Sequence, residues 1–359
     1  MKIGIFIRGQ SELFNNGCNQ QALFVYQSIK SIGYECFFFT ANTDEKYFLD
    51  HKTYDISKNW NLLLSLNVFI CLSNTFSQVE VAKNIRASGV KMVNYNCGNM
   101  YYMFMEDILF DCHNYVTDDI INRHSVYDQL WVIPNCTKDI HFYKSITRGT
   151  QIYTAPYVWN TDVVDMIIES KPNDLHYNTS NNGTKYILIA EGNVNIVKSS
   201  MIPLLICEEL YNTYEDIRII VLCKRETKGF KNFCNNLEIH KAGLVEYYPR
   251  ISYLDTLYQL REKGLDVYVL SHHHDNPLNF LHLETLYLNY PLIHNSKWYS
   301  KAGYYYKDIQ NGAKQLLHAF ECHKNKIEAY KSNTERVLQM FSPYNSTNKT
   351  IYKRYLDEL

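Results

Sequence analysis

Short apolar runs rich in β-branched and aromatic residues alternate along the first half of the chain with segments of helical periodicity. This alternation is typical of parallel sheets covered by helices, so we predict an α/β fold. The first half forms one doubly wound domain, residues 1–170. Its predicted strands are 2–7, 35–40, 68–72, 91–95, 129–133 and 152–155, and its predicted helices are 19–31, 77–87 and 100–110.

The second half repeats the alternation and predicts a second doubly wound domain, residues 185–340. A polar, Asn-rich stretch at 171–184 separates the halves and reads as an exposed linker. A Phe341-Ser-Pro break precedes an amphipathic end, so residues 341–359 are expected to pack back on the first domain. The predicted strands are 185–190, 217–223, 243–247, 265–270 and 291–294, and the predicted helices are 199–211, 252–262 and 277–288.

Composition narrows the possible partners. Lys and Arg total 36 and Asp and Glu total 37 in 359 residues, a net charge of -1 that provides no general field for nucleic acid. Apolar runs fall short of the ~20 residues of a membrane span, and the N-terminal run is too short for a signal peptide. We therefore expect a cytoplasmic protein, with peripheral membrane contact left open. The ten cysteines are scattered without a CxxC pair, which indicates reduced thiols.

Two doubly wound sheets in tandem bind ligands at the carboxyl ends of their strands. The first strand-to-helix turn, residues 8–19, lacks the spacing of a dinucleotide fingerprint or a P-loop. Gly17 in this turn either presents backbone amides to a phosphate or sugar or is an ordinary loop glycine.

The most informative segment is residues 271–295, SHHHDNPLNFLHLETLYLNYPLIHN. Asn276 fits a helix N-cap, with Pro277 at the first helical position, and the amides of such a helix end suit a diphosphate. Glu284 follows roughly 12 Å along the helix, at ~1.5 Å per residue, where it would accept hydrogen bonds from a ribose diol. The alternative is that Asn276 is only a cap and Glu284 only a solvated helix residue.

The Asn276-x7-Glu284 spacing resembles the E-x7-E segment of GT-B glycosyltransferases, in which an acidic pair brackets the sugar donor. The second Glu matches, whereas Asn276 stands at the first position, with Asp275 just before it. Residues 191–198, EGNVNIVK, also resemble the GT-B segment GR…KG, whose basic residues bind the donor diphosphate. Lys198 matches the basic residue, and Asn193 replaces the Arg.

Further blocks resemble a largely uncharacterised bacterial family of predicted GT-B glycosyltransferases. This resemblance implies two Rossmann-like domains and nucleotide-sugar transfer, and it brings no established substrate or catalytic residue. The blocks are residues 94–99, 131–134, 155–159, 195–209, 276–279, 291–296 and 303–306.

A glycosyltransferase stabilises the charge that develops on its leaving nucleoside diphosphate. Lys198 is the first candidate for this role, and Arg225, after the strand 217–223, is a second. Asn295 follows the strand 291–294 and either touches the donor or forms a turn. For each lysine or arginine, a solvated surface position is the alternative.

The run His272-His273-His274-Asp275 contains residue types that bind metals, but neighbouring residues of an extended segment point to opposite sides. Three consecutive histidines are therefore poorly placed to share one ion, and the GT-B resemblance also implies no tightly bound metal. His272 is instead the candidate to hydrogen-bond a phosphate or sugar, and we include it among the catalytic candidates.

The first domain is expected to hold the acceptor. Asn96, Gly98 and Asn99 follow the strand 91–95, and Glu106 on the next helix is the candidate general base of an inverting enzyme. Exposed carboxylates on helices are usually only solvated, and this is the alternative for Glu106. Cys97 lacks an identifiable His partner, which argues against a nucleophile.

The sequence thus predicts a glycosyltransferase that moves a sugar from a nucleoside-diphosphate donor to a glycan or glycoconjugate, with no cofactor besides this substrate. Two alternatives remain open. One is a nucleotide-sugar epimerase of the same architecture, and the other is a non-catalytic nucleotide- or sugar-binding subunit of a glycan assembly complex.

Overall fold

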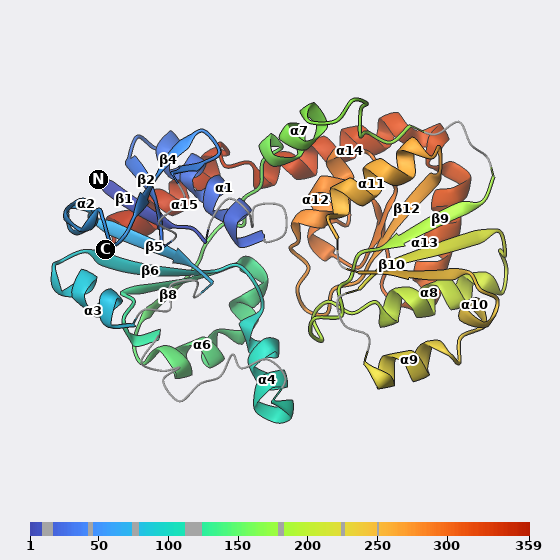
Figure 1. Ribbon diagram of the computed structural model, residues 1–359, viewed down its shortest axis with the longest axis horizontal. Coiled ribbons are helices and arrows are strands. Elements are labelled where there is room, and N and C mark those ends of the chain that lie inside the picture. The colour runs from blue at the N-terminus through green and yellow to red at the C-terminus, as the bar shows by residue number, and fades with distance from the viewer. Residues whose placement is uncertain are drawn as a thin grey trace. The chain divides into compact units, whose positions relative to one another are not determined.

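The computed structural model describes residues 1–8, 17–41, 46–73, 79–111, 124–178, 183–223, 227–249 and 251–359. The chain divides into two compact units. The first unit consists of Met1–Asn160 together with Phe341–Leu359, and the second of Thr161–Met340 (Figure 1).

The first unit contains an eight-stranded sheet in the order β3-β4-β2-β1-β5-β6-β7-β8, in which only the β3–β4 pair is antiparallel. Its central strand β5 is apolar and fully buried, and the neighbouring β6 is buried apart from its first residue, as expected for a parallel sheet covered on both faces. The strands are β1 (Lys2–Phe6), β2 (Glu35–Thr40), β3 (Tyr47–Phe48), β4 (His51–Asp55), β5 (Val68–Leu72), β6 (Lys91–Asn96), β7 (Gln129–Val132) and β8 (Gln151–Thr154). The α-helices are α1 (Gly17–Ser31), α2 (Trp60–Leu64), α3 (Val79–Ala87), α4 (Met100–Phe110), α6 (Ile140–Thr147) and α15 (Ser346–Asp357).

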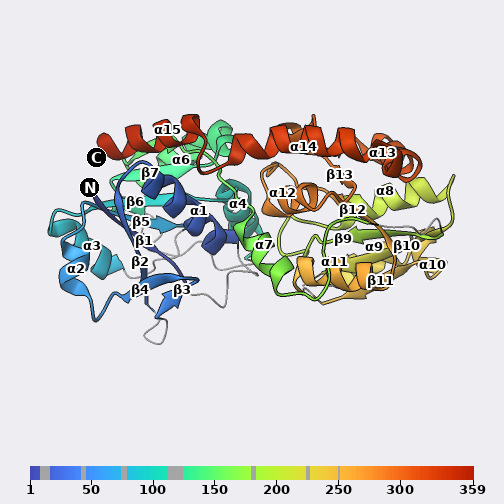
Figure 2. The same ribbon diagram turned by 90° about the horizontal axis from the view of Figure 1, so that it is seen from above.

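The second unit contains a six-stranded sheet that is parallel throughout, in the order β11-β10-β9-β12-β13-β14. Helices α8 and α13 pack together on one face of this sheet, and α11 lies on the other (Figure 2). The strands are β9 (Lys185–Ile189), β10 (Ile217–Leu222), β11 (Val245–Tyr248), β12 (Asp266–Ser271), β13 (Leu292–His294) and β14 (Tyr304–Tyr305). The α-helices are α7 (Asp162–Glu169), α8 (Met201–Tyr211), α9 (Lys228–Cys234), α10 (Glu238–Lys241), α11 (Tyr253–Glu262), α12 (Phe280–Tyr287), α13 (Ile309–Cys322) and α14 (Ile327–Phe341).

The predicted α/β class and two doubly wound sheets are confirmed, and the predicted strands all occur, within two residues at their ends. The sequence analysis missed elements that are short or lie at sheet edges, such as β3, β4, β14 and the short helices α2 and α10. Two to five residues are too few to show a period. No helix in the described part of the chain is both long and apolar enough to cross a lipid bilayer.

The boundary between the units differs from the predicted linker 171–184. The contacts place it after Asn160, and the described part of the predicted linker packs on the second unit. Leu175 is fully buried, Lys171 pairs with Asp255 at 2.6 Å, and the Tyr177 hydroxyl donates to Asp266 at 2.9 Å. The polar composition of this segment therefore reflects specific side-chain bonds, which a hydropathy pattern does not reveal.

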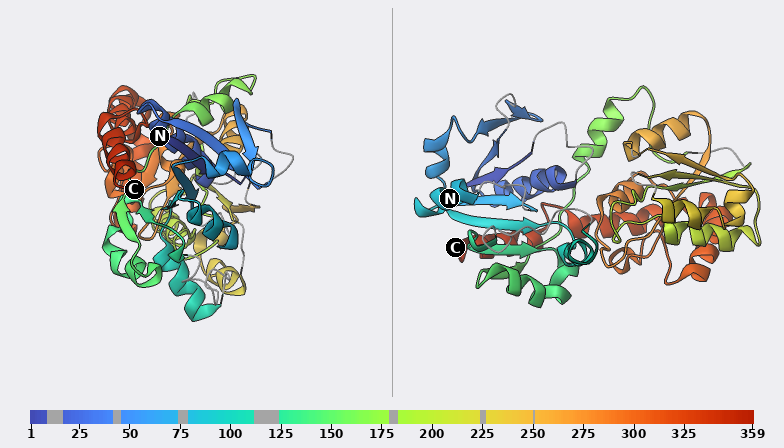
Figure 3. Two further views of the ribbon diagram at one scale, coloured as in Figure 1. Left: turned by 90° about the vertical axis from the view of Figure 1, so that its left-hand side faces the viewer. Right: turned by 60° about the horizontal axis from the view of Figure 1, so that its bottom comes forward.

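The C-terminal segment Phe341–Leu359 belongs to the first unit, the domain on which the sequence analysis placed residues 341–359. Helix α15 lies against α1, and it is drawn in red in the views of Figure 3. The Ser28 hydroxyl donates to the Pro343 carbonyl at 3.0 Å, and the Tyr352 hydroxyl donates to the Pro156 carbonyl at 2.7 Å. These buried bonds attach the end of the chain to α1 and to the segment that follows β8.

A buried ion pair joins β9 and β12 where the two strands begin. Lys185 and Asp266 are register partners, their Nζ and Oδ2 atoms are 2.7 Å apart, and the Asp266 side chain is fully buried. Tyr177 and Lys324 also contact the Asp266 carboxylate. Removal of one partner would leave a buried charge poorly compensated.

We predict that Lys185→Met lowers the free energy of unfolding by about 3 kcal/mol, because the Asp266 carboxylate loses its nearest cation. Urea denaturation followed by circular dichroism measures this change. The control Lys241→Met removes an exposed pair with Glu238 and should change stability by less than about 1 kcal/mol. Equal losses in the two variants would contradict a structural role for the buried pair.

Candidate functional site

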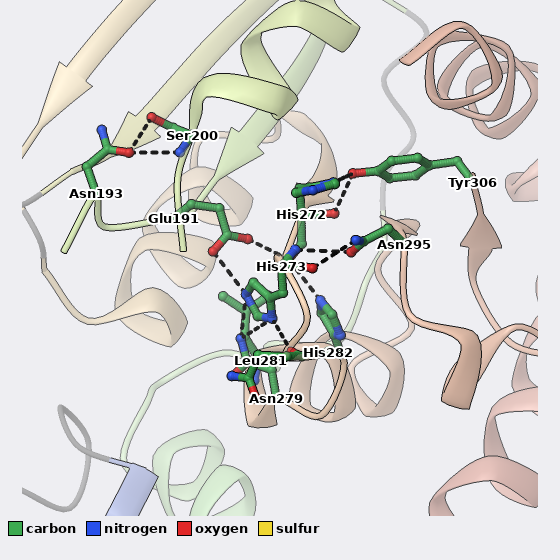
Figure 4. Close-up of polar contacts among 12 residues, drawn as sticks. Glu191, Asn193, Ser200, His272, His273, Asn279, Leu281, His282, Asn295 and Tyr306 are labelled. Carbon is green, nitrogen blue, oxygen red and sulfur yellow. Dashed lines mark hydrogen bonds and ion pairs between the residues drawn. The ribbon is translucent and has the colours of Figure 1, made fainter. Parts of the chain in front are cut away.

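The strand order of the second unit reverses between β9 and β12. The chain proceeds from β9 towards β10 and β11, and from β12 towards β13 and β14, so the two neighbouring strands lead to opposite edges of the sheet. Ligands of doubly wound sheets bind at such a point, outside the carboxyl ends of the strands. Residues Glu191 and Ser271–His273 lie at these ends (Figure 4).

Glu191 is the centre of a buried hydrogen-bond network. Its side chain is 1% exposed, and it accepts a hydrogen bond from the Ser271 hydroxyl at 2.5 Å. His273 Nε2 lies 3.0 Å from the second carboxylate oxygen. The Ser271 oxygen also lies 2.8 Å from His282 Nε2, and because the serine hydrogen points to Glu191, the His282 nitrogen is the donor. The network thus joins β9, β12 and α12.

The environment keeps Glu191 ionised. Burial raises the pKa of Glu191, but its interactions with His273, with the Ser271 hydroxyl and with the charge of Lys198 together outweigh burial and lower the pKa below its ordinary value. The same lysine charge contributes to lowering the pKa of His282, behind the larger effect of burial. The predicted donor residue Lys198 therefore lies within electrostatic reach of this network.

Two loops meet at the carboxyl end of the sheet. The His274 amide donates to the Val197 carbonyl at 3.0 Å, which joins the loop after β12 to the loop after β9. Asn193, which replaces the Arg of the GT-B segment, accepts hydrogen bonds from the Ser200 amide and hydroxyl through Oδ1. Asn193 therefore has a structural role at the start of α8.

Helix α12 begins three residues later than predicted. Its N-cap is Asn279, whose side chain accepts from the Leu281 amide at 3.2 Å, and the first helical residue is Phe280. Asn276 is not the cap, and its carbonyl oxygen lies 3.2 Å from His273 Nδ1. Pro277 therefore belongs to the loop. Both Asn276 and Asn279 are strong N-cap residues, so composition alone did not distinguish them.

This shift changes the position of Glu284. It lies about 7.5 Å along the axis from the Asn279 cap, in place of the predicted 12 Å from Asn276, and its side chain is 7% exposed. The charge of Glu284 contributes to raising the pKa of Tyr253 on α11, after the larger effect of burial. Glu284 therefore lies near the packing of α12 on α11, and a solvated helix position is excluded.

A pocket of about 700 Å³ opens at the carboxyl ends of β12, β13 and β14. Two predicted donor residues, Asp275 and Asn295, line it. Asn295 is fixed by two bonds to the His273 backbone, at 3.0 and 2.9 Å. The other lining residues are His273, Pro277, Lys297, Trp298, Tyr305, Tyr306 and Lys307.

The pocket combines positive charge with aromatic surface. Lys297 and Lys307 are exposed, and neither ammonium forms an ion pair within the described part of the chain. Trp298 is 40% exposed. Ammonium groups suit anions, and an exposed indole suits the apolar face of a sugar or a base. These three residues were not predicted, because no strand or helix pattern marks the loops that carry them.

The remaining predicted residues lie elsewhere. Arg225 falls outside the described residues. In the first unit, Asn96 at the end of β6 is fully buried, and neither polar atom of its side-chain amide has a hydrogen-bond partner in the described ranges. Asn99 is the N-cap of α4, and Gly98 precedes it. Gly17 is the exposed first residue of α1, and Glu106 is half-buried on α4.

The structure also bears on Cys97. Burial, with a contribution from Cys18, raises the pKa of its thiol well above the ordinary value despite a hydrogen bond with Ser73. A protonated thiol is a poor nucleophile, in agreement with the sequence analysis.

Among the described residues, one group of side chains brings three potential metal ligands within 4.8 Å of one another, and it consists of His318, Glu321 and Cys322 on α13. The segment His272–Asp275 forms no such group. The rings of His272 and His273 have separate partners, Tyr306 and Glu191.

Comparison with protein families matches residues 1–356 to a family described as "Protein of unknown function (DUF2827)". The chain belongs to this family. No curated protein sequence matches the chain significantly.

Solved structures resemble the family member throughout its length. A lipopolysaccharide outer core galactosyltransferase, WaaB in its apo form, has 13% identity and a TM-score of 0.56, covering 98% of this chain and 100% of its own. An alpha-glucosyltransferase in complex with UDP and a 13-mer DNA has 11% identity and a TM-score of 0.59, covering 99% and 98%. A trehalose-6-phosphate synthase studied with bisubstrate glycomimetics has 11% identity and a TM-score of 0.59, covering 100% and 99%. These similarities confirm the predicted GT-B fold.

The network around Glu191 is the main feature that sequence analysis missed. From sequence, Glu191 is only the first residue of the segment resembling GR…KG, with no predicted role of its own. A carboxylate placed directly after the first strand of the second unit, and a serine and histidines at the end of β12, were the available signals. Only the strand order shows that these ends are neighbours.

We predict that the second unit of this family member loses stability as pH falls from about 6.5 towards 4. Burial lowers the pKa of His272, His294 and His323 to about 4 each, so the unfolded chain binds protons in this window that the folded chain does not. For a fully buried residue such as His294, the loss is on the order of 3 kcal/mol. Urea unfolding midpoints at pH 7 and pH 4 measure it, and unchanged midpoints would contradict the prediction.

Proposed function

We propose that this chain is a glycosyltransferase that moves a sugar from a nucleoside-diphosphate donor to a glycan or glycoconjugate acceptor. The observation that carries the proposal is the pocket at the carboxyl ends of β12–β14, in the second unit of a GT-B fold. The GT-B structures described above include glycosyltransferases, one of them in complex with UDP.

The lining of the pocket suits a donor of this kind. Lys297 and Lys307 provide positive charge, Trp298 provides an aromatic face, and Asp275 and Asn295 provide polar atoms for hydroxyl groups. A volume of about 700 Å³ lies within the usual range of small-molecule sites.

Lys198 is proposed to stabilise the leaving diphosphate. Its charge contributes to lowering the pKa of Glu191, so it acts at the point where the strand order of the second unit reverses. Arg225, outside the described residues, remains a second candidate. We propose that Glu284 and Asn276 contribute to the donor site from α12 and the loop before it.

The first unit is proposed to hold the acceptor. The buried Asn96 amide offers one hydrogen-bond donor group and one acceptor that have no partner among the described residues, a combination that suits a sugar hydroxyl or a water that bridges to it. Gly98 and Asn99 lie between β6 and the start of α4 in the same unit. Gly17 is the first residue of α1, the helix that follows β1. Glu106 is the proposed base of an inverting reaction.

A two-stage experiment tests this function. Thermal-shift screening measures binding of UDP, GDP and their sugars, and an assay of donor hydrolysis and transfer then measures turnover. Binding with turnover of the donor supports a glycosyltransferase. Binding without turnover indicates a non-catalytic subunit, and interconversion of the sugar without an acceptor indicates an epimerase. No stabilisation by any nucleotide or nucleotide-sugar would overturn the proposal.

We predict that Lys198→Ala and Glu284→Gln each weaken nucleotide binding by about tenfold, the equivalent of one lost charge-assisted hydrogen bond. Isothermal titration calorimetry measures the affinity. Lys314→Ala, which removes an exposed lysine on α13, is the matched control and should leave it unchanged. Unchanged affinity in both test variants, with the fold intact by circular dichroism, would remove these residues from the site.

A further inference from the structure

His272 occupies a defined position at the carboxyl end of β12. It is the first residue after this strand, and its ring is half-buried. Its Nδ1 atom lies 2.9 Å from the Tyr306 hydroxyl oxygen, and Tyr306, just after β14, lines the pocket (Figure 4). The backbone carbonyl of Ser271 lies 3.1 Å from the same hydroxyl.

These two contacts determine where the protons lie. Burial raises the pKa of Tyr306 well above its ordinary value, so the hydroxyl keeps its single hydrogen. The carbonyl of Ser271 can only accept, and it receives that hydrogen. The tyrosine oxygen is then the acceptor for the imidazole, and His272 Nδ1 must carry a proton. If the Tyr306 hydroxyl donated its hydrogen to His272 Nδ1 instead, the oxygens of Tyr306 and Ser271 would lie 3.1 Å apart with no hydrogen between them.

The His272 ring is neutral at pH 7, and its second nitrogen therefore has a lone pair. Burial lowers the pKa of His272 to about 4, and the neighbouring His273 and His274 act in the same direction, while the Glu191 carboxylate opposes them without reversing the shift. With Nδ1 protonated, Nε2 is the unprotonated nitrogen. Within the described part of the chain, Nε2 makes no hydrogen bond.

A lone pair on Nε2 selects the chemical group that it can bind. It accepts a hydrogen bond, so it needs a donor from the ligand. Phosphate oxygens in a diphosphate ester are negative and carry no hydrogen at pH 7, and such an oxygen would be repelled. A hydroxyl group donates a hydrogen, and a nucleotide-sugar carries hydroxyls on both its sugar and its ribose.

We propose that His272 accepts a hydrogen bond, through Nε2, from a hydroxyl of the bound nucleotide-sugar, and that Tyr306 is a positioning residue that fixes the tautomer. This inference rests on the proposed function and refines it, since it assigns His272 to hydroxyl recognition and not to the diphosphate. Ser271 contributes through its backbone carbonyl, which the side-chain network to Glu191 holds in place.

The first experiment compares ligands with and without the transferred sugar. His272→Asn keeps an amide near the Nδ1 position for Tyr306 and removes the acceptor at Nε2. We expect about tenfold weaker binding of UDP-glucose, or of GDP-mannose if the chain binds guanine nucleotides, from the loss of one buried hydrogen bond. If only the affinity for the nucleotide-sugar falls, the hydroxyl that binds Nε2 belongs to the transferred sugar. If the affinity for UDP or GDP falls equally, that hydroxyl belongs to the ribose.

The control for this experiment is His318→Asn, which changes a histidine on α13. It should bind all four ligands like the unmodified chain. Normal affinities for all ligands in His272→Asn would overturn the inference while the proposed function stands. If the unmodified chain bound neither nucleotides nor nucleotide-sugars, the proposed function would fail, and the inference would fail with it.

The second experiment tests the proton positions without any ligand. Nitrogen chemical shifts of the ¹⁵N-labelled His272 ring at pH 7 should show a protonated Nδ1 and an unprotonated Nε2. Tyr306→Phe removes the acceptor for Nδ1 and should increase the Nε2-protonated tautomer, with a matching loss of UDP-glucose affinity. A mainly Nε2-protonated ring or an imidazolium in the unmodified chain would overturn the inference.

Discussion

The second unit depends on the attachment of β9 to β12 at both ends of the strands. Lys185 and Asp266 form an ion pair where the strands begin, and Glu191 bonds to Ser271 and His273 where they end. Between these pairs the strands are joined by a parallel ladder of apolar residues. A buried charge is stable only with a partner, so each pair also fixes the register of two strands that are distant in sequence.

This attachment determines the geometry at the carboxyl end of the sheet. Strands β9 and β12 lead to opposite sheet edges, and their loops would diverge without side chains that connect them. Glu191 holds His273, His273 holds Asn295 through its backbone, and Asn295 lines the pocket. The pocket is therefore supported by a chain of bonds that begins at a buried carboxylate.

Sequence periodicity predicted the strands and long helices, because a buried parallel strand and an amphipathic helix each leave a regular pattern. It also predicted that Asp275 and Asn295 lie at the carboxyl ends of strands, which the structure shows to line one pocket. It failed at the cap of α12, where Asn276 and Asn279 are equivalent by propensity and only the bond from Leu281 to Asn279 distinguishes them.

Other features lay beyond any local pattern. The pairing of Glu191 with His273 joins residues 82 positions apart and follows from strand order. The polar segment around Tyr177 resembled a linker, because a bond to a buried carboxylate leaves no trace in hydropathy. The pocket residues Lys297, Trp298 and Lys307 are on short irregular segments, where neither period applies.

A crystal structure of the full chain with a bound nucleoside diphosphate, UDP or GDP according to which stabilises the protein, would test the account most directly. The account predicts the diphosphate beside Lys198 at the carboxyl ends of β9 and β12, with the attached groups extending towards Asp275 and Asn295. A nucleotide bound at another surface of the chain, with the Glu191 network unliganded, would contradict it.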